Sequence, residues 1–97
     1  MYEGTLAIRP AAPKDERGLR RLAALDSGPT LTGDVLVAET DGVLVAAITM
    51  SDGTVAADPF RHTVVAVHLL RLRRFQLLRG WPPARKFLRR LQPEAGV

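Results

Sequence analysis

The sequence predicts an α/β (α+β) domain built on a mostly antiparallel sheet of four strands. Two Asp-Gly pairs, at residues 41–42 and 52–53, each lie between runs of β-favouring residues. Such pairs supply the positive φ values that tight hairpin turns need. One helical pattern precedes the two hairpins and another follows them. The expected order is therefore strand, helix, three strands and helix, or β-α-β-β-β-α.

The first strand is expected at residues 5–9, with Leu6 and Ile8 on one face, and Pro10 ends its pairing. A helix follows near Pro13, because the first turn of a helix has no partner for the N–H group that proline lacks. The Ser-Gly-Pro run at residues 27–29 ends this helix. We expect its apolar face to contain Leu19, Leu22, Ala23 and Leu25, and its water-facing side to contain Arg17, Arg20 and Arg21.

The next three strands are expected to form an antiparallel meander at residues 34–40, 43–51 and 54–58. Residues 43–48 are apolar almost without interruption. A run of this kind is typical of a central strand that is covered on both faces. The middle strand is therefore expected to lie inside the sheet rather than at its edge.

The second helix is expected at residues 63–78, where no helix-breaking residue occurs. One of its sides is predicted to hold Val64, Val67, Leu70 and Phe75, and the other Val65, Leu69, Leu72 and Leu77. A helix that is apolar nearly all round needs two coverings. We expect the sheet to be one of them, with Phe75 in the core, and a second copy of the chain to be the other. The sequence thus predicts a homo-oligomer, with a homodimer as its simplest form.

The chain is electrically asymmetric, although its net charge is only +4. Residues 1–60 hold 5 basic and 9 acidic side chains, whereas residues 61–97 hold 9 basic side chains and a single acidic one, Glu94. This asymmetry predicts an anionic partner: nucleic acid, a membrane surface, a phosphate-bearing cofactor or the chain's own acidic half. The basic side chains expected to contact it are Arg71, Arg74, Arg79, Arg85, Lys86, Arg89 and Arg90.

Composition also excludes several kinds of site. The chain has no cysteine, which excludes disulfides, thiolate nucleophiles and cysteine-based metal sites, and its two histidines are too few to build a metal centre alone. The N-terminus lacks the pattern of a secretory signal, and no stretch is apolar enough for a transmembrane segment. We expect a cytoplasmic protein with one domain at residues 1–80 and a basic C-terminal tail at residues 81–97.

Three stretches carry a resemblance to a known family. The first is Ile8-Arg9-Pro10-Ala11 with Asp15, and the second is Val35-Leu36-Val37-Ala38-Glu39 with the Asp-Gly turn and the apolar strand that follow it. The third is Val55-Ala56-Ala57-Asp58-Pro59, followed by residues 61–66 and the Leu69-Leu70 pair. In this order the stretches resemble the first half of the GNAT acyltransferase family. The resemblance covers residues 5–79 and implies a GNAT-like half fold.

The resemblance also implies where a cofactor would bind. In the family, a similar Asp-Pro leads to a Gln/Arg-x-x-Gly-x-Gly/Ala loop, whose N–H groups at a helix N-terminus bind the pyrophosphate of acetyl-CoA. The matching positions here are Arg61, His62, Thr63, Val64, Val65 and Ala66. Val64 departs from the pattern, because a branched side chain occupies the space that glycine leaves open for the phosphates. The link from Pro59 to Arg61 is also one residue shorter than usual, and both differences weaken cofactor binding.

The family's later strands and last helix have no counterpart here, and the only tyrosine that could serve as a general acid is Tyr2, at the opposite end of the chain. We therefore expect a truncated, non-catalytic binding or self-assembly module. One alternative is a minimal acetyl-CoA-dependent N-acetyltransferase, with acetyl-CoA as its cofactor and catalytic residues that are unknown. The other is a basic-face binder of nucleic acid or of an anionic membrane surface.

Several candidate residues also have a plain structural interpretation. Residues 61–63 can be an ordinary helix start with Thr63 as the N-cap. Glu39 and Asp58 could act as general bases, but strand-end and turn structure also explains them. The spacing of His62 and His68 does not place two ligands one helical turn apart, so no metal site is expected.

Overall fold

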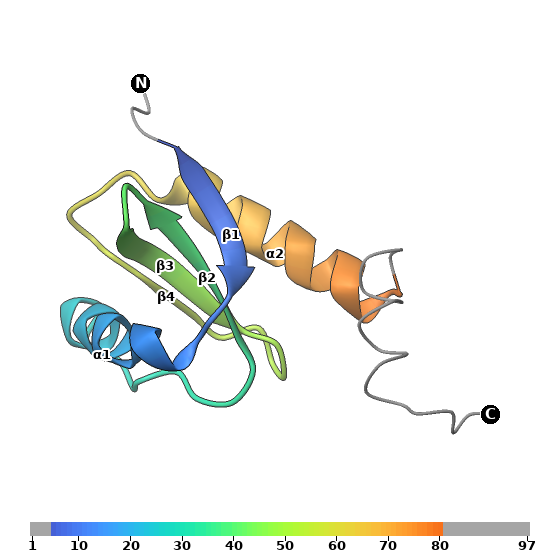
Figure 1. Cartoon of the computed structure of the whole chain (residues 1–97), viewed down its shortest axis with the longest axis horizontal. Coiled ribbons are helices and arrows are strands. Elements are labelled where there is room, and N and C mark those ends of the chain that lie inside the picture. The colour runs from blue at the N-terminus through green and yellow to red at the C-terminus, as the bar shows by residue number, and fades with distance from the viewer. Residues whose placement is uncertain (1–4, 81–97) are drawn as a thin grey trace.

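The computed structural model describes residues 5–80 of the chain. Its four strands form one antiparallel sheet in the order β1-β2-β3-β4, with α1 on one face and α2 on the other (Figure 1). The predicted α+β class and the order of elements are confirmed. The elements are β1 (Leu6–Pro10), a 3-10 turn η1 (Pro13–Asp15), α1 (Glu16–Leu25), β2 (Val35–Thr40), β3 (Val43–Thr49), β4 (Val55–Ala57) and α2 (Val64–Leu78).

The first Asp-Gly pair forms the tight hairpin that the sequence predicts. Asp41 and Gly42 have φ values of 51° and 81°, and they join Thr40 directly to its partner Val43. Positive φ at both central residues is the condition for a turn whose twist matches that of the two strands. The register of β2 against β3 next to the turn, with Thr40 opposite Val43 and Glu39 opposite Leu44, follows from this turn.

The second Asp-Gly pair lies in a wider connection than predicted. Only Gly53 has positive φ, at 74°. The Asp52 carboxylate accepts hydrogen bonds from the Thr49 hydroxyl at 2.5 Å and from the Thr54 hydroxyl at 2.8 Å. These bonds close a loop over residues 50–54, so β3 ends at Thr49 rather than at residue 51, and β4 is limited to Val55–Ala57.

The pairing of β2 with β3 contains a bulge. Ala38 lies opposite Ala46 and Glu39 opposite Leu44, so that Val45 is skipped. The extra residue allows Val45 and Ala46 to face the α2 side together. The carbonyl of Val45 accepts the N–H of Asp58 at 2.9 Å. The bulge therefore positions the point where the chain leaves β4.

The α1 face of the sheet is closed by a compact cluster. Its buried members are Leu22, Leu31, Val35, Val37, Leu44, Ala47 and Ala56. Gly18 explains the close approach of α1 to β3, because a Cβ atom there would lie 2.8 Å from the Leu44 Cδ1 atom. Glycine lowers the intrinsic stability of a helix. At position 18, however, it is the only residue that fits without a shift of the Leu44 side chain.

The α2 face is closed by Leu36, Ala38, Val45, Ala46, Ile48, Ala66 and Leu70, with Val67 and Leu77 packed at the margin. The predicted grouping of Val64 and Phe75 with Leu70 is wrong, because Leu70 is fully buried whereas Val64 and Phe75 are 82% and 55% exposed. Val64 and Phe75 project from the side of the helix that faces away from the sheet. Apolar residues surround α2 as expected, but the sheet covers only one side of it.

The predictions for the basic tail fall outside the described residues. They concern residues 81–97 as a segment and Arg85, Lys86, Arg89 and Arg90 within it. Among residues 5–80, no helix has the length and apolar character needed to cross a membrane.

Candidate functional site

The predicted cofactor loop lies at the start of α2, where the chain leaves β4. Arg61 and His62 are exposed, and Thr63 occupies the N-cap position. Val64 and Val65 project into solvent, whereas Ala66 is buried against the sheet. Residues 61–65 therefore form an accessible edge of the molecule, and Ala66 acts as part of the core.

The N-terminus of α2 is open to a ligand on its polar side. Thr63 is the N-cap by position, as predicted, but its hydroxyl makes no capping hydrogen bond, and the first turn has no acidic side chain. The N–H groups of a first helical turn lack partners within the helix and carry partial positive charge. Arg61 adds a full positive charge beside them. The exposed Val64 side chain lies on the same turn and would compete for space with an approaching phosphate.

Asp58 is a structural residue that fixes this loop. Its side chain is buried, and its carboxylate accepts hydrogen bonds from Arg21 Nη2 at 2.9 Å and from the N–H of Phe60 at 2.9 Å. The Nε atom of Arg61 lies 3.9 Å from the same carboxylate. Since both oxygens are engaged, the structure favours the strand-end interpretation of Asp58 over a role as general base.

Arg21 does not simply face water as predicted. It extends from α1 to the sheet, where its Nη1 atom donates to the carbonyl of Leu44 at 3.1 Å. With the bond to Asp58, this contact ties α1 to β3 and to the end of β4. Periodicity missed the contact because it assigns a helix face, whereas a long arginine side chain can reach past the edge of that face.

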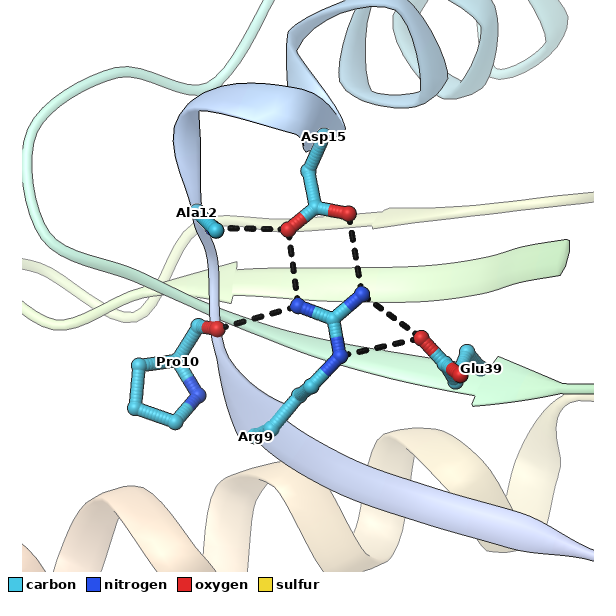
Figure 2. A network of polar contacts seen from close by, with 5 residues as sticks. All are labelled: Arg9, Pro10, Ala12, Asp15 and Glu39. Atoms are coloured by element: carbon cyan, nitrogen blue, oxygen red, sulfur yellow. Dashed lines mark hydrogen bonds and ion pairs between the residues drawn. The ribbon is translucent and has the colours of Figure 1, made fainter. Parts of the chain in front are cut away.

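A second, partly buried network joins β1, β2 and the start of α1. Figure 2 shows the Arg9 guanidinium between two carboxylates: Nη1 and Nη2 lie 2.7 and 2.9 Å from the two oxygens of Asp15, and Nη2 lies 2.6 Å from Glu39 Oε1. Asp15 also accepts the N–H of Ala12 at 2.7 Å. Hydrogen bonds from Arg9 hold the pKa of the buried Asp15 carboxyl at about 2. Glu39 therefore has a structural role, as Asp58 has in its own network. We call the network of Arg9, Asp15 and Glu39 the clamp.

The sequence did contain a signal for half of this clamp. Ala7 lies opposite Glu39 in the register of β1 against β2, so Arg9 and Glu39 are diagonal neighbours on one face. Opposite charges in diagonal positions are within reach of each other on a sheet. The bond to Asp15 had no such signal, because it depends on the way the chain turns after Pro10.

The arginines in and just after α2 that were predicted to bind an anion divide into two groups. Arg74 is turned back toward the sheet, where its guanidinium donates to the carbonyls of Met50 at 3.0 Å and Ser51 at 3.3 Å. Arg71 is exposed, and the guanidinium of Arg79 lies 5.3 Å from the centre of the Phe75 ring. Of the predicted anion-binding residues within 5–80, Arg71 and Arg79 are available to a partner, and Arg74 is already engaged in the fold.

The most distinctive surface is the side of α2 that faces away from the sheet. We call it the outward face and define it by the exposed residues Val64, Val65, His68, Arg71, Leu72, Phe75, Leu78 and Arg79. Its five apolar side chains are between 44% and 82% exposed, and Phe60 lies just before it, 82% exposed. The C-terminal turns of α2 extend past the strands (Figure 1). Exposed apolar side chains gathered on one side of a helix in this way point to a binding site.

No cluster of three potential metal ligands occurs within the part of the chain that the structure describes. Comparisons with protein-family models, with curated proteins and with solved structures found no match to this chain. The resemblance to GNAT acyltransferases therefore rests on the residues quoted above and stays a prediction. The candidate site is the outward face of α2 together with the open helix start at residues 61–65.

Proposed function

We propose that this chain is a GNAT-like binding module that performs no acyl transfer of its own and contacts its partner through the outward face of α2. One observation carries the proposal: five apolar side chains are exposed along a single side of a helix whose other side is packed on the sheet. Burial of such side chains against a partner releases about 25 cal/mol for each Å² of apolar surface removed from water.

The other helix shows that this exposure is not a general property of the chain. The exposed residues of α1 are Glu16, Arg17, Arg20, Arg21 and Ala24. Apart from Ala24 and from Arg21, whose guanidinium is bonded to the sheet and to Asp58, they form the polar outer side that is typical of a helix packed on one face only. The difference between α1 and α2 supports a specific use for the outward face.

A second copy of the chain is one partner that such a face could take, and it is the one that the sequence predicts. Size-exclusion chromatography with light scattering tests this at increasing protein concentration. If the outward face joins two copies, the mass doubles and the double substitution Phe75→Ser with Leu78→Ser restores the monomer. The matched control is Val43→Ser, which removes an exposed apolar side chain from the hairpin and should change nothing.

The non-catalytic part of the proposal has its own test. The protein is incubated with acetyl-CoA and a panel of primary amines, and the release of free thiol is followed. We expect no release above the rate without protein. Sustained transfer of the acetyl group to an amine would overturn this part and leave the outward face as a separate question.

The open start of α2 favours one second candidate, an acetyl-CoA-dependent N-acetyltransferase. Arg61 and the uncapped N–H groups of the first turn would hold the pyrophosphate, and the amine would attack the thioester directly. The exposed side chain of Val64 argues against it. Thermal unfolding with acetyl-CoA decides, because a ligand at 100 times its Kd adds about 2.7 kcal/mol of stability, and a domain of this size shifts by roughly 4 to 8 °C for each kcal/mol.

A further inference from the structure

We infer that the partner of the outward face is an anionic membrane surface, on which α2 lies flat with its apolar side chains inserted among the lipid headgroups. This inference rests on the proposed function, because it names the partner of the same face. It is carried by the combination, on one side of one helix, of exposed apolar side chains and of two arginines, Arg71 and Arg79, that pair with no carboxylate among residues 5–80.

The apolar side chains of the outward face are spread along the whole length of α2. From Val64 to Leu78 the helix advances by about 21 Å. Val64 and Val65 lie at its start, Leu72 and Phe75 in its second half and Leu78 at its end, and Phe60 extends the apolar surface beyond the N-terminus. Helices that lie in a membrane interface bury a face of this kind to a depth of about 5 to 10 Å.

The charge of residues 59–80 favours a membrane over a second copy of the chain as the partner of the outward face. From Pro59 to Gly80 the chain has five arginines and no acidic residue. Two outward faces pressed together would bring Arg71 and Arg79 of each copy into one apolar interface without a carboxylate to neutralise them. Lipid phosphates supply the missing negative charge, and each Lys or Arg near an anionic surface strengthens binding about fivefold.

The Arg79 side chain shows how a charged group and an apolar ring of the outward face can both contact a membrane. Its guanidinium lies over the ring of Phe75, 5.3 Å from the centroid. An arginine can keep its charged end in the headgroup layer while its stem and the neighbouring ring remain in the apolar region. Arg71 lies one turn before Phe75, is exposed, and can do the same, since its side chain has no hydrogen bond or ion pair to residues 5–80.

Nucleic acid fits the same face less well. Binding to nucleic acid draws on phosphate contacts and on base stacking against aromatic rings. Phe75 on the outward face and Phe60 beside it could stack on bases, but the four aliphatic side chains of the face would stay in water on such a partner. On a lipid surface these four side chains contribute to binding.

The position of α1 in the fold is compatible with α2 lying on a membrane. The helix α1, with its exposed Glu16 and its polar outer side, lies on the opposite face of the sheet (Figure 1). When α2 rests on the membrane, α1 therefore points into water. Neither helix has to leave the sheet for binding to occur.

The test is flotation of the full chain with lipid vesicles in a density gradient. One set of vesicles contains phosphatidylcholine alone and the other equal parts of phosphatidylcholine and phosphatidylglycerol, at low and at moderate salt. We expect binding to the anionic vesicles that is at least tenfold stronger than to the neutral ones and that weakens as salt screens the charges. A fluorescent oligonucleotide at both salt concentrations serves as the nucleic-acid probe.

Three substitutions assign the binding to the outward face. Phe75→Ser should weaken vesicle binding about tenfold, because the exposed half of its ring no longer leaves water. Arg71→Gln should weaken it about fivefold. Arg17→Gln, on the far side of the sheet, removes the same charge and should have no effect. Unchanged circular dichroism and melting temperature show that all three variants are folded.

The outcomes distinguish this inference from the proposed function. If the protein ignores anionic vesicles but forms a dimer that Phe75→Ser disrupts, or binds the oligonucleotide through Arg71, the outward face is a binding surface and the membrane is the wrong partner. Vesicle binding that Arg17→Gln weakens as much as Arg71→Gln also overturns the inference. If no form of binding depends on Phe75 or Arg71, both the membrane inference and the proposed function are wrong.

Discussion

The clamp of Arg9, Asp15 and Glu39 makes a prediction about acid stability. The pKa of Asp15 is lowered from 3.8 to about 2, first of all by its hydrogen bonds to Arg9. A folded-state pKa below the unfolded value means that the ionised carboxylate stabilises the native state. The difference of about two pH units corresponds to about 2 kcal/mol, which is present above pH 4 and is lost as the pH falls through about 2.

The substitution Asp15→Asn tests this reasoning, because it keeps the shape of the side chain and removes the charge. Near neutral pH the variant should lose about 2 kcal/mol of unfolding free energy, equivalent to a fall of roughly 8 to 16 °C in melting temperature. Glu39 remains to balance the charge of Arg9. As the pH is lowered from about 4 toward 2, the wild-type protein should lose its advantage and the two stability curves should converge.

The assay is urea unfolding followed by circular dichroism at a series of pH values. Glu16→Gln is the matched control, because it removes an acidic side chain that pairs with Arg20 at an exposed position. Its effect should stay below about 0.5 kcal/mol. If Asp15→Asn were as stable as the wild type at neutral pH, or if the two curves ran parallel through the acid range, the clamp would not stabilise the fold in the way described.

Three further predictions concern packing and ligand access. Gly18→Ala should lower stability by up to about 2 kcal/mol in urea unfolding, because the added Cβ would lie 2.8 Å from the Leu44 side chain and the overpacking cost of about 1 to 3 kcal/mol exceeds the gain of about 1 kcal/mol in helix propensity; a stabilised variant would contradict the close approach of α1. Leu70→Ala should cost about 2 to 5 kcal/mol in the same assay, whereas Phe75→Ala should cost less than about 1 kcal/mol, since Leu70 is 0% and Phe75 55% exposed. Val64→Gly should gain acetyl-CoA binding, seen as a rise in melting temperature with cofactor that the wild type lacks; equal responses would show that this side chain does not control access.

The elements of the fold were predictable where a local rule determines the backbone. The Asp41-Gly42 turn is the best case, since both residues adopt the positive φ that the pair favours. The Asp52-Gly53 pair was less informative, because the Asp52 side chain bonds Thr49 and Thr54 and widens the loop. Hydrogen bonds between side chains of this kind leave no periodic trace in a sequence.

The side of α2 that packs on the sheet could not be predicted. Apolar residues surround this helix, so the pattern gave no direction, and the sheet selects Ala66 and Leu70 because their small or well-fitting side chains allow close packing. The long side chains were harder still. Arg21 and Arg74 were predicted to be available to water or to a partner, and each instead reaches backbone carbonyls of the sheet or of a loop beside it.

The bulge at Val45 has a consequence for how the domain opens. The carbonyls of two adjacent residues there, Leu44 and Val45, hold Arg21 of α1 and the backbone of Asp58, and Asp58 in turn holds both Arg21 and the segment that enters α2. The two helices lie on opposite faces of the sheet, yet hydrogen bonds connect both of them to the bulge in β3. Hydrogen exchange at the amides of Asp58 and Phe60 should report the release of either helix, so that α1 and α2 come loose together rather than one at a time.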